Sequence, residues 1–192
     1  TTHIDITCFG LNDGSAIVTV SGGTPYSFGS PYIYLWNDAL SQTSSIANGL
    51  SQGSYSCTVI DSNLCTKTSS SIFVLEPTEL IIDSTFVSNI SCNGYNDGDA
   101  VVVNPSGGTP FMGGSYSFLW NDSLSQTTST AINLSPGIYN CTISDAYGCS
   151  IVTPDLTIIE PDVIVASLSA VNPLCYGDLG IAACGSVSGG TP

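Results

Sequence analysis

The chain has 192 residues, of which only 8% are charged, and 15 Asp+Glu against one Lys+Arg give a net charge of −14. Because binding to phosphates requires many Lys and Arg side chains, this composition excludes a nucleic-acid-binding role and disfavours anionic membrane surfaces. The hydrophobic fraction of 42% is enough for packed cores, so the chain is not an acidic disordered tail.

Short strand-like runs, separated by Gly, Pro and Asn-Asp clusters, follow one another along the chain, and helical periodicity is absent. In chain order, the expected strands of the first stretch are Ile4–Cys8, Ala16–Val20, Tyr32–Trp36, Ser44–Ala47, Ser54–Ile60 and Ser71–Leu75. Apolar Tyr55, Cys57 and Val59 alternate with polar residues, which predicts one buried and one solvated face.

The whole pattern is then repeated. Trp36 and Trp120 are 84 positions apart, and so are Cys65 and Cys149. The motif Ser-Gly-Gly-Thr-Pro occurs three times, beginning at Ser21, Ser106 and Ser188. Such a period indicates a tandem-repeat protein. We expect repeat 1 over residues 1–83, repeat 2 over residues 84–166, and the first strands of a third, incomplete repeat over residues 167–192.

The number of short strands in each repeat is typical of a two-sheet sandwich, and a Trp that precedes Tyr-x-Cys is typical of immunoglobulin domains. The second-strand cysteine of that pattern is replaced by Ile17 or Val18 in repeat 1 and by Val101 or Val102 in repeat 2, while the third repeat has Cys184 there. The predicted fold is therefore all-β, with tandem immunoglobulin-like β-sandwich repeats arranged end to end. The junctions contain Pro77 and Pro161 and no Gly/Ser linker, which predicts a semi-rigid rod.

Eight cysteines in so short a chain favour an oxidising, extracellular compartment. A thiolate metal site would need close pairs such as Cys-x-x-Cys, and the sequence has none. Two interpretations stay open for Cys57 and Cys141, as buried free thiols or as members of a second bridge, and Cys175 and Cys184 have no assigned partner. No apolar run approaches the ~18 residues of a membrane span, so we expect no membrane insertion of this segment.

Each repeat resembles the SprB-type repeat of gliding-motility adhesins. That family opens with Cys-x-Gly-x-x-Asp-Gly-x-Ala, continues through Gly-Gly-Thr-Pro to an aromatic strand ending in Trp, and closes with Gly-x-Tyr and a final Cys. Two departures are that Leu64 replaces the usual Gly before the last cysteine of repeat 1 and that the third repeat lacks the Asp-Gly step. The matching residues of repeat 1 are Cys8, Gly10, Asp13, Gly14, Ala16, Gly22–Pro25, Tyr34, Trp36, Gly49, Leu50, Gly53, Tyr55, Asp61 and Cys65.

The resemblance implies that the two cysteines bracketing each repeat form a disulfide, so that Cys8 pairs with Cys65 and Cys92 with Cys149. Each bond would close a loop of about 57 residues and contribute ~4 kcal/mol. The family implies very long proteins exported by the type IX system to the outer surface of gliding bacteria, where they act as adhesins or filaments. We accordingly expect a stretch of a longer array, or a part-repeat that docks on another subunit.

The function expected from this resemblance is that of a structural or adhesive repeat segment in a bacterial extracellular surface fibre or adhesin, and not that of an enzyme. The expected partner is the protein itself, as a tandem array or a homo-oligomeric filament, together with surface glycans as a further option. The alternatives are a glycan-binding module that uses calcium, and a spacer in a larger secreted enzyme.

The residue types give little support to catalysis. His3 is the only imidazole and Lys67 the only cationic side chain, so no Ser-His-Asp site can be built in both repeats. No cofactor is expected except calcium, for which Asp13, Asp97 and Asp99 are weak candidates because hard cations bind oxygen ligands. The competing interpretation is that these carboxylates cap turns.

Glycosylation is a further candidate modification. The sequence pattern Asn-x-Ser/Thr marks four candidate N-glycan acceptors, at Asn89, Asn121, Asn133 and Asn140. Ser84 and Ser123 each follow an Asp and resemble the sites at which bacteria of this kind attach O-glycans.

Overall fold

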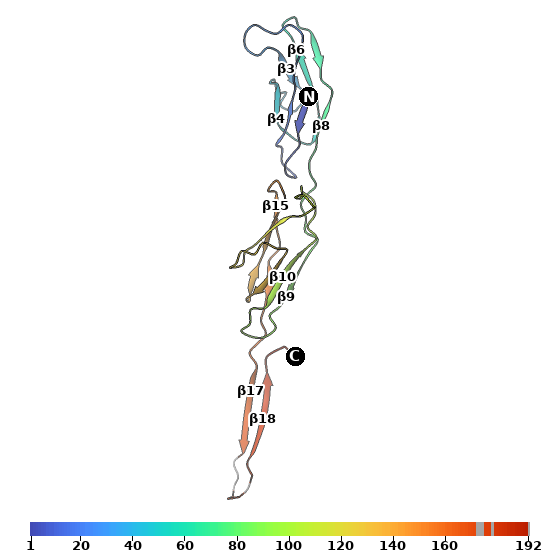
Figure 1. The fold of residues 1–192 in the computed structure, drawn as a ribbon. Coiled ribbons are helices and arrows are strands. Elements are labelled where there is room, and N and C mark those ends of the chain that lie inside the picture. The colour runs from blue at the N-terminus through green and yellow to red at the C-terminus, as the bar shows by residue number, and fades with distance from the viewer. Residues whose placement is uncertain (172–174, 178, 192) are drawn as a thin grey trace. The chain divides into compact units, whose positions relative to one another are not determined.

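The computed structural model describes residues 1–171, 175–177 and 179–191, and every regular element in them is a β-strand (Figure 1). The expectation of an all-β fold is confirmed. Nowhere in this described part does the chain form a helix long and apolar enough to cross a bilayer.

The chain divides into two compact units. Unit 1 contains Thr1–Ile81, Ser106–Tyr116 and Ser144–Ile151, and unit 2 contains Ile82–Pro105, Ser117–Ile143 and Val152–Pro192. Unit 1 thus combines nearly all of repeat 1 with two segments of repeat 2. The limits of the sequence repeats stay predictions, because compactness and sequence periodicity divide the chain by different criteria.

Repeat 1 forms three antiparallel sheets, with strand orders β1-β2-β4, β3-β6-β7 and β5-β8. The strands are β1 Thr2–Ile4, β2 Gly14–Ile17, β3 Ile33–Trp36, β4 Ile46–Leu50, β5 Gly53–Tyr55, β6 Cys57–Ile60, β7 Thr66–Thr68 and β8 Ile72–Val74.

The predicted strand Ser54–Ile60 is in fact two strands, because Ser56 leaves the ladder. Its N–H donates to Asn37 Oδ1 at 2.8 Å, and its carbonyl accepts the Asn37 N–H at 3.1 Å. The chain therefore changes from pairing with β8 to pairing with β3 at this residue. Strand β7 was not predicted, since its Thr-Lys-Thr sequence is fully exposed and carries no apolar alternation.

The core of repeat 1 lies between the β2–β4 pair and the β3–β6 pair. Trp36 is 2% exposed and stands opposite Cys57 in the register of β3 and β6. Its indole N–H donates to the Ser44 carbonyl at 2.9 Å, which satisfies the polar atom inside the core. Val18 is the buried member of the pair left open by the sequence, with an exposed fraction of 7%. The predicted dry face is confirmed at Tyr55 and Cys57.

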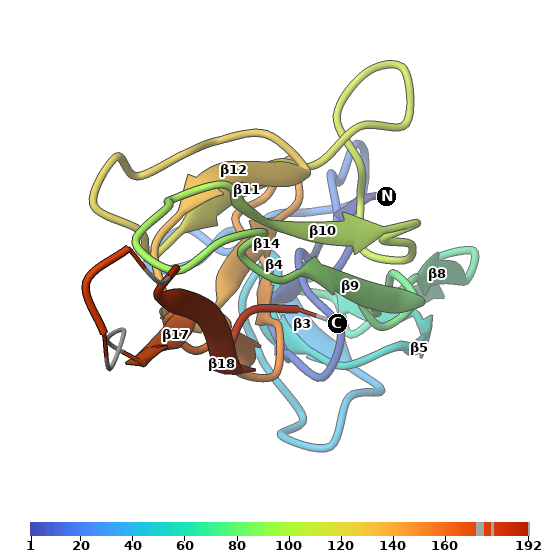
Figure 2. The same cartoon turned by 90° about the horizontal axis from the view of Figure 1, so that it is seen from below.

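Repeat 2 has the corresponding strands, and sheet orders β12-β10-β9, β11-β14-β15 and β13-β16. Strands β9 and β10 lie side by side in both views (Figures 1 and 2), with five residue pairs in register. Trp120 is 1% exposed and Cys141 is 0% exposed, so the core of repeat 1 recurs. The strands are β9 Ser84–Ser88, β10 Gly98–Val103, β11 Ser117–Trp120, β12 Thr130–Leu134, β13 Gly137–Tyr139, β14 Cys141–Ser144, β15 Ser150–Val152 and β16 Leu156–Ile158.

The third, incomplete repeat contributes one antiparallel hairpin, formed by β17 Val165–Val171 and β18 Ile181–Ser188 (Figure 1). Both strands are exposed along their whole length, and the thiol of Cys184 is free. Cys175 is also an exposed free thiol. Of the predicted range 167–192, residues 172–174, 178 and 192 lie outside the described residues.

Candidate functional site

A disulfide joins Cys8 to Cys149, whose Cα atoms are 5.6 Å apart and whose sequence separation is 141. The expected pairs, Cys8 with Cys65 and Cys92 with Cys149, are therefore wrong. Cys65 and Cys92 are exposed free thiols. The bond connects the opening cysteine of repeat 1 to the closing cysteine of repeat 2, within unit 1.

The two cysteines of repeat 1 cannot pair because they lie at opposite ends of its strands. Cys8 lies at the end of the sheet where Gly14 begins β2, next to Asp13, which accepts the N–H of Thr7. Cys65 lines a groove with Val18, beyond the other end of β2. The rise from Gly14 to Val18 is about 13 Å at roughly 3.3 Å per residue, which exceeds the ~7 Å that a disulfide spans between Cα atoms.

The residues Thr78–Ile81, called the linker segment below, pair with the Ser106–Gly108 edge of repeat 2. Ile81 and Ser106 exchange two backbone hydrogen bonds, of 2.8 and 3.0 Å, and the Gly108 N–H donates to the Thr78 carbonyl at 2.8 Å. Leu80 is only 7% exposed in this position. A strand-like contact with a buried apolar side chain thus connects the junction to repeat 2.

Gly107 is required at this contact for two reasons. Its φ is +82°, a left-handed conformation that L side chains rarely adopt, and a Cβ atom there would lie 1.8 Å from the Glu79 carbonyl oxygen. The second residue of the Ser-Gly-Gly-Thr-Pro motif is therefore glycine because the linker backbone passes directly over it.

The same contact occurs again in unit 2. The Gly190 N–H donates to the Asp162 carbonyl at 2.8 Å. Gly189 has a φ of +83°, and a Cβ on it would lie 2.0 Å from the Val163 carbonyl oxygen. Asp162 and Val163 correspond to Thr78 and Glu79 at the 84-residue period. The Ser-Gly-Gly edge is therefore a recurring receptor for the segment that precedes a repeat.

The loop that carries Cys149 is held by the carboxylate of Asp145. This carboxylate accepts the backbone N–H groups of Thr109 at 2.7 Å, Tyr147 at 2.9 Å and Cys149 at 3.0 Å. It thereby fixes the cysteine against the Gly-Gly-Thr-Pro turn, with Gly148 at a φ of +83°.

The equivalent loop of repeat 1 is held by Asp61. Its carboxylate accepts the N–H groups of Thr24 at 3.0 Å, Asn63 at 2.9 Å and Cys65 at 2.9 Å. The backbone hydrogen bonds from Thr24 and then Cys65 hold the pKa of Asp61 below its ordinary value. Leu64, the departure noted in the sequence, takes a φ of +63°, which is the left-handed conformation that favours glycine.

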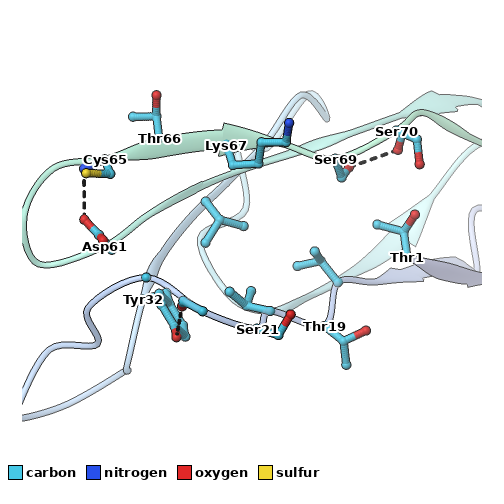
Figure 3. A pocket seen from close by; sticks show the side chains of 15 residues that line it. Thr1, Thr19, Ser21, Tyr32, Asp61, Cys65, Thr66, Lys67, Ser69 and Ser70 are labelled. Carbon is cyan, nitrogen blue, oxygen red and sulfur yellow. Dashed lines mark hydrogen bonds between the residues drawn. The ribbon is translucent and has the colours of Figure 1, made fainter.

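A groove of about 400 Å³ lies over the Ser21–Gly23 edge of repeat 1. Figure 3 shows Cys65, Thr66 and Lys67 along one side of it, and Tyr32, Ser21 and Thr19 along the other. Apolar side chains of Val18, Val20 and Val59 also line it, and the Tyr32 hydroxyl donates to the Gly22 carbonyl at 2.7 Å.

The calcium candidates Asp13 and Asp97 are occupied by hydrogen bonds of their own chain. The Asp13 carboxylate accepts the hydroxyl and the N–H of Thr7, and the Asp97 carboxylate accepts the same two groups of Ser91. Asp99 stands opposite Ser88 in the β10–β9 ladder. Within the described ranges, no cluster of three or more His, Cys, Asp or Glu side chains has a metal-binding arrangement. A calcium role for these residues stays a prediction.

These hydrogen bonds predict acid sensitivity. The hydroxyl and then the backbone N–H of Thr7 hold the pKa of Asp13 below its ordinary value of 3.8, and Ser91 does the same for Asp97. A carboxylate with a lowered folded-state pKa contributes stability that is present above pH 4 and is lost as pH falls through the folded-state pKa. Urea unfolding at pH 7, 4 and 2 should therefore show falling stability. The double variant Asp13→Asn/Asp97→Asn should be less stable than wild type at pH 7 and nearly equal to it at pH 2, and an undiminished difference at pH 2 would contradict this assignment.

The glycosylation candidates differ in accessibility. Ser123, Asn89, Asn121 and Asn133 are exposed, whereas Ser84 and Asn140 are half-buried. Two of them serve the fold, since Asn89 Oδ1 accepts the Ile159 N–H at 3.1 Å and Asn121 Oδ1 accepts the Asn140 N–H at 2.9 Å. Glycan attachment at all six positions stays a prediction.

Cys57 and Cys141 are free thiols buried beside the core tryptophans, each 0% exposed. They occupy the positions of small apolar residues, which is the first of the two interpretations left open by the sequence. Burial raises the pKa of both thiols, that of Cys141 to about 11.

The buried thiols should resist alkylation in the native state. Raising the pKa of Cys141 from 9.0 to about 11 lowers its thiolate fraction roughly 100-fold, and burial slows the reagent further. Mass spectrometry after iodoacetamide treatment at pH 8 should show labelled Cys65 and Cys92 and unlabelled Cys57 and Cys141. Labelling of Cys141 as fast as Cys92, before denaturant is added, would contradict the buried position.

His3 and Lys67 are the residues weighed for catalysis. His3 lies in the exposed strand β1, with Nε2 3.4 Å from Asp5 Oδ1, and Lys67 lines the groove of repeat 1. The sequence analysis included Gly107 only as part of the Ser-Gly-Gly-Thr-Pro motif, and it missed the contact that the linker segment makes with this edge. The available signal was the apolar position shared by Leu80 and Ile164 after each Glu-Pro step.

Comparison with solved structures finds the amphioxus IgVJ-C2 molecule, at 12% sequence identity and a TM-score of 0.30, over 77% of this chain and 97% of that chain. No curated protein sequence matches the chain.

Comparison with protein families matches the SprB repeat over residues 1–41 and 84–125. The two matched segments begin 83 positions apart, close to the sequence period, and each contains an opening cysteine and a core tryptophan. SprB repeats form a structural, non-enzymatic repeat family associated with surface adhesin-type proteins. Two segments of the chain, residues 1–41 and 84–125, therefore match the SprB repeat.

Proposed function

We propose that the chain is a structural segment of a bacterial extracellular fibre or adhesin, in which tandem SprB repeats form a stalk for adhesion or gliding. The observation that carries the proposal is the Cys8–Cys149 disulfide, which joins the opening of repeat 1 covalently to the closing loop of repeat 2. A cross-link between successive repeats is of use where a protein bears tension, because it keeps the chain from extending when one repeat unfolds.

The junction supports the same function. The linker segment directly follows Pro77 and is held by three backbone hydrogen bonds to Ser106 and Gly108. A junction fixed in this way is stiffer than a Gly/Ser linker, which behaves as a random coil. Stiff junctions suit a stalk that holds a distal part away from the cell.

Single-molecule stretching tests the mechanical part of the proposal. With the disulfide intact, the 141 residue steps between Cys8 and Cys149 cannot extend, whatever the force on the two ends of the chain. Reduction should release about 490 Å of additional contour length, at roughly 3.5 Å per residue. An unchanged contour length after reduction would show that the bond does not limit extension.

Immunogold electron microscopy tests the location. Antibodies raised against the chain should label filaments on intact, unpermeabilised cells of the producing bacterium. Labelling that appears only after the cells are opened would overturn the surface role.

A glycan array probed with the whole chain separates a stalk from a glycan-binding module, since a stalk segment should bind none of the arrayed sugars.

A further inference from the structure

We propose that the groove of repeat 1 is a docking site for the linker segment of another SprB repeat, and that Cys65 forms a disulfide with the opening cysteine of that repeat. The occupant is an acidic, Pro-containing linker with an apolar side chain at the position of Leu80, together with the opening-cysteine loop, like that of Cys8, of the repeat that this linker ends. This inference goes beyond a role as a stalk, because it assigns a binding site and a reactive thiol.

Three equivalent glycines of the Ser-Gly-Gly-Thr-Pro motifs differ in what lies over them. Gly22, Gly107 and Gly189 have φ values of +80°, +82° and +83°. A Cβ on Gly107 or Gly189 would collide with a linker carbonyl oxygen, whereas a Cβ on Gly22 would meet nothing within 4 Å. The backbone of repeat 1 thus already has the receptor conformation, and the space that a linker fills in the other two copies is open.

Equivalent residues of the two repeats also differ in burial. Ile143 in repeat 2 is 0% exposed, while its equivalent Val59 is half-buried and lines the groove. Cys149 is half-buried in its disulfide, and its equivalent Cys65 is exposed. The groove of repeat 1 therefore has a half-buried apolar wall at Val59 and a free thiol at Cys65, where the equivalent residues of repeat 2 are buried or joined in a disulfide.

The two linkers of this chain indicate the chemistry of the occupant. Both linkers of this chain follow a Glu-Pro step, at Glu76 and Glu160, and both present an apolar residue four positions after the glutamate, Leu80 or Ile164. The groove is lined by one carboxylate, that of Asp61, which accepts N–H groups of its own loop, and by Lys67, the only cationic side chain of the chain, which an acidic linker would meet there. Linkers of this kind pair with the Ser-Gly-Gly edges at Ser106 and Ser188. A linker of the same kind is therefore the occupant that the equivalent edge at Ser21 fits.

The covalent step requires an oxidant of the small-molecule disulfide class, such as oxidised glutathione. The Cys65 thiolate attacks one sulfur of the oxidant, which forms a mixed disulfide and releases one thiolate. The thiolate of the incoming opening cysteine then attacks the Cys65 sulfur and releases the second. Two thiols lose two protons and two electrons to form one S–S bond, and the oxidant becomes two thiols.

The test extends the full chain by a copy of residues 1–84 placed before Thr1, which preserves the period. The added copy carries Cys65→Ser, so that it has no closing cysteine, and Phe9→Tyr, which marks its opening cysteine by mass. After oxidation with glutathione, non-reducing peptide mapping should link the marked opening cysteine to Cys65 of the original repeat 1. The Cys8–Cys149 link in the same map shows that the original part is folded.

Matched glycine variants separate docking from chance proximity. Gly22→Ala in the original repeat 1 should abolish the new link, because its Cβ would occupy the path of the linker carbonyl. Gly29→Ala should keep the link, since Gly29 has a similar φ of +77° and open surroundings, so it suffers the same backbone strain without blocking the groove.

Two results would overturn the proposal. One is free, alkylatable Cys65 in the folded extended chain, and the other is an equal yield of the link in Gly22→Ala. Should the first extension fail to fold, a copy of residues 85–168 with Cys149→Ser supplies Cys92 as the opening cysteine, and a Cys92–Cys65 link is expected. Absence of that link as well rejects the docking site. Neither result depends on where the protein is located, so the surface role stands or falls separately.

Discussion

Replacing Cys8 and Cys149 together by serine should lower the free energy of unfolding by about 5 kcal/mol. That is the chain-entropy value for a cross-link across 141 residues, since the reduced chain gains the freedom that the bond removes from the unfolded state. The double variant leaves no unpaired thiol at the site. Guanidinium unfolding followed by the fluorescence of Trp36 and Trp120 measures the change.

Cys92→Ser is the matched control for this prediction. Cys92 corresponds to Cys8 at the repeat period, but its thiol is free and exposed. Its replacement should change stability by less than about 0.5 kcal/mol, as is usual for exposed positions. If Cys92→Ser proved as destabilising as the Cys8/Cys149 variant, each repeat would be closed by its own bond, and the pairing across repeats would be wrong.

Much of each repeat could be predicted from sequence because the signals are local. Alternation at Tyr55 and Cys57 gave the buried face, and the Trp of one strand indeed stands opposite the Cys of another. These features depend on residues that face each other within one sheet. The strand break at Ser56 could not be predicted, because it results from a hydrogen bond to the side chain of Asn37, a residue 19 positions earlier that follows the end of β3.

The disulfide pairing could not be predicted for a different reason. Four equivalent cysteines allow three pairings, and a repeat period makes the pair within a repeat and the pair across repeats look alike. The choice depends on which end of the strands each cysteine occupies. It also depends on the linker segment, whose contact with Ser106 and Gly108 lies beside the closing-cysteine loop of repeat 2. Neither the strand end that a cysteine occupies nor the contact of the linker segment can be read from a short stretch of sequence.

The recurring aspartates fit two interpretations from sequence alone, namely calcium binding and the capping of turns. Asp13 and Asp61 have the residue type that calcium prefers, yet their oxygens accept hydrogen bonds from Thr7 and from Thr24 and Cys65. In a chain with so few cations, backbone N–H groups are the donors at hand for these carboxylates. Their recurrence in repeat 2 follows from the recurrence of the turns that they hold.

The second large effect is expected at the core tryptophan of repeat 2. Trp120→Ala should cost about 3–5 kcal/mol, the range for removing a buried Trp or Phe, because the cavity cannot fully collapse. Trp120 is 1% exposed, and its indole N–H donates to the Thr128 carbonyl at 2.9 Å. The substitution therefore also leaves that carbonyl without its partner. Far-UV circular dichroism during guanidinium unfolding is a suitable measurement, since it does not rely on the lost fluorophore.

Leu119→Ala on the same strand is the control, because Leu119 is 52% exposed on the opposite face of β11. Its cost should stay below about 1 kcal/mol, since little of the removed surface was taken from water on folding. Strand propensity changes in the same direction in both variants, so the difference between them isolates burial. Equal losses for Leu119→Ala and Trp120→Ala would mean that the alternation of β11 does not define an interior, and the same inference for Trp36 in repeat 1 would fail with it.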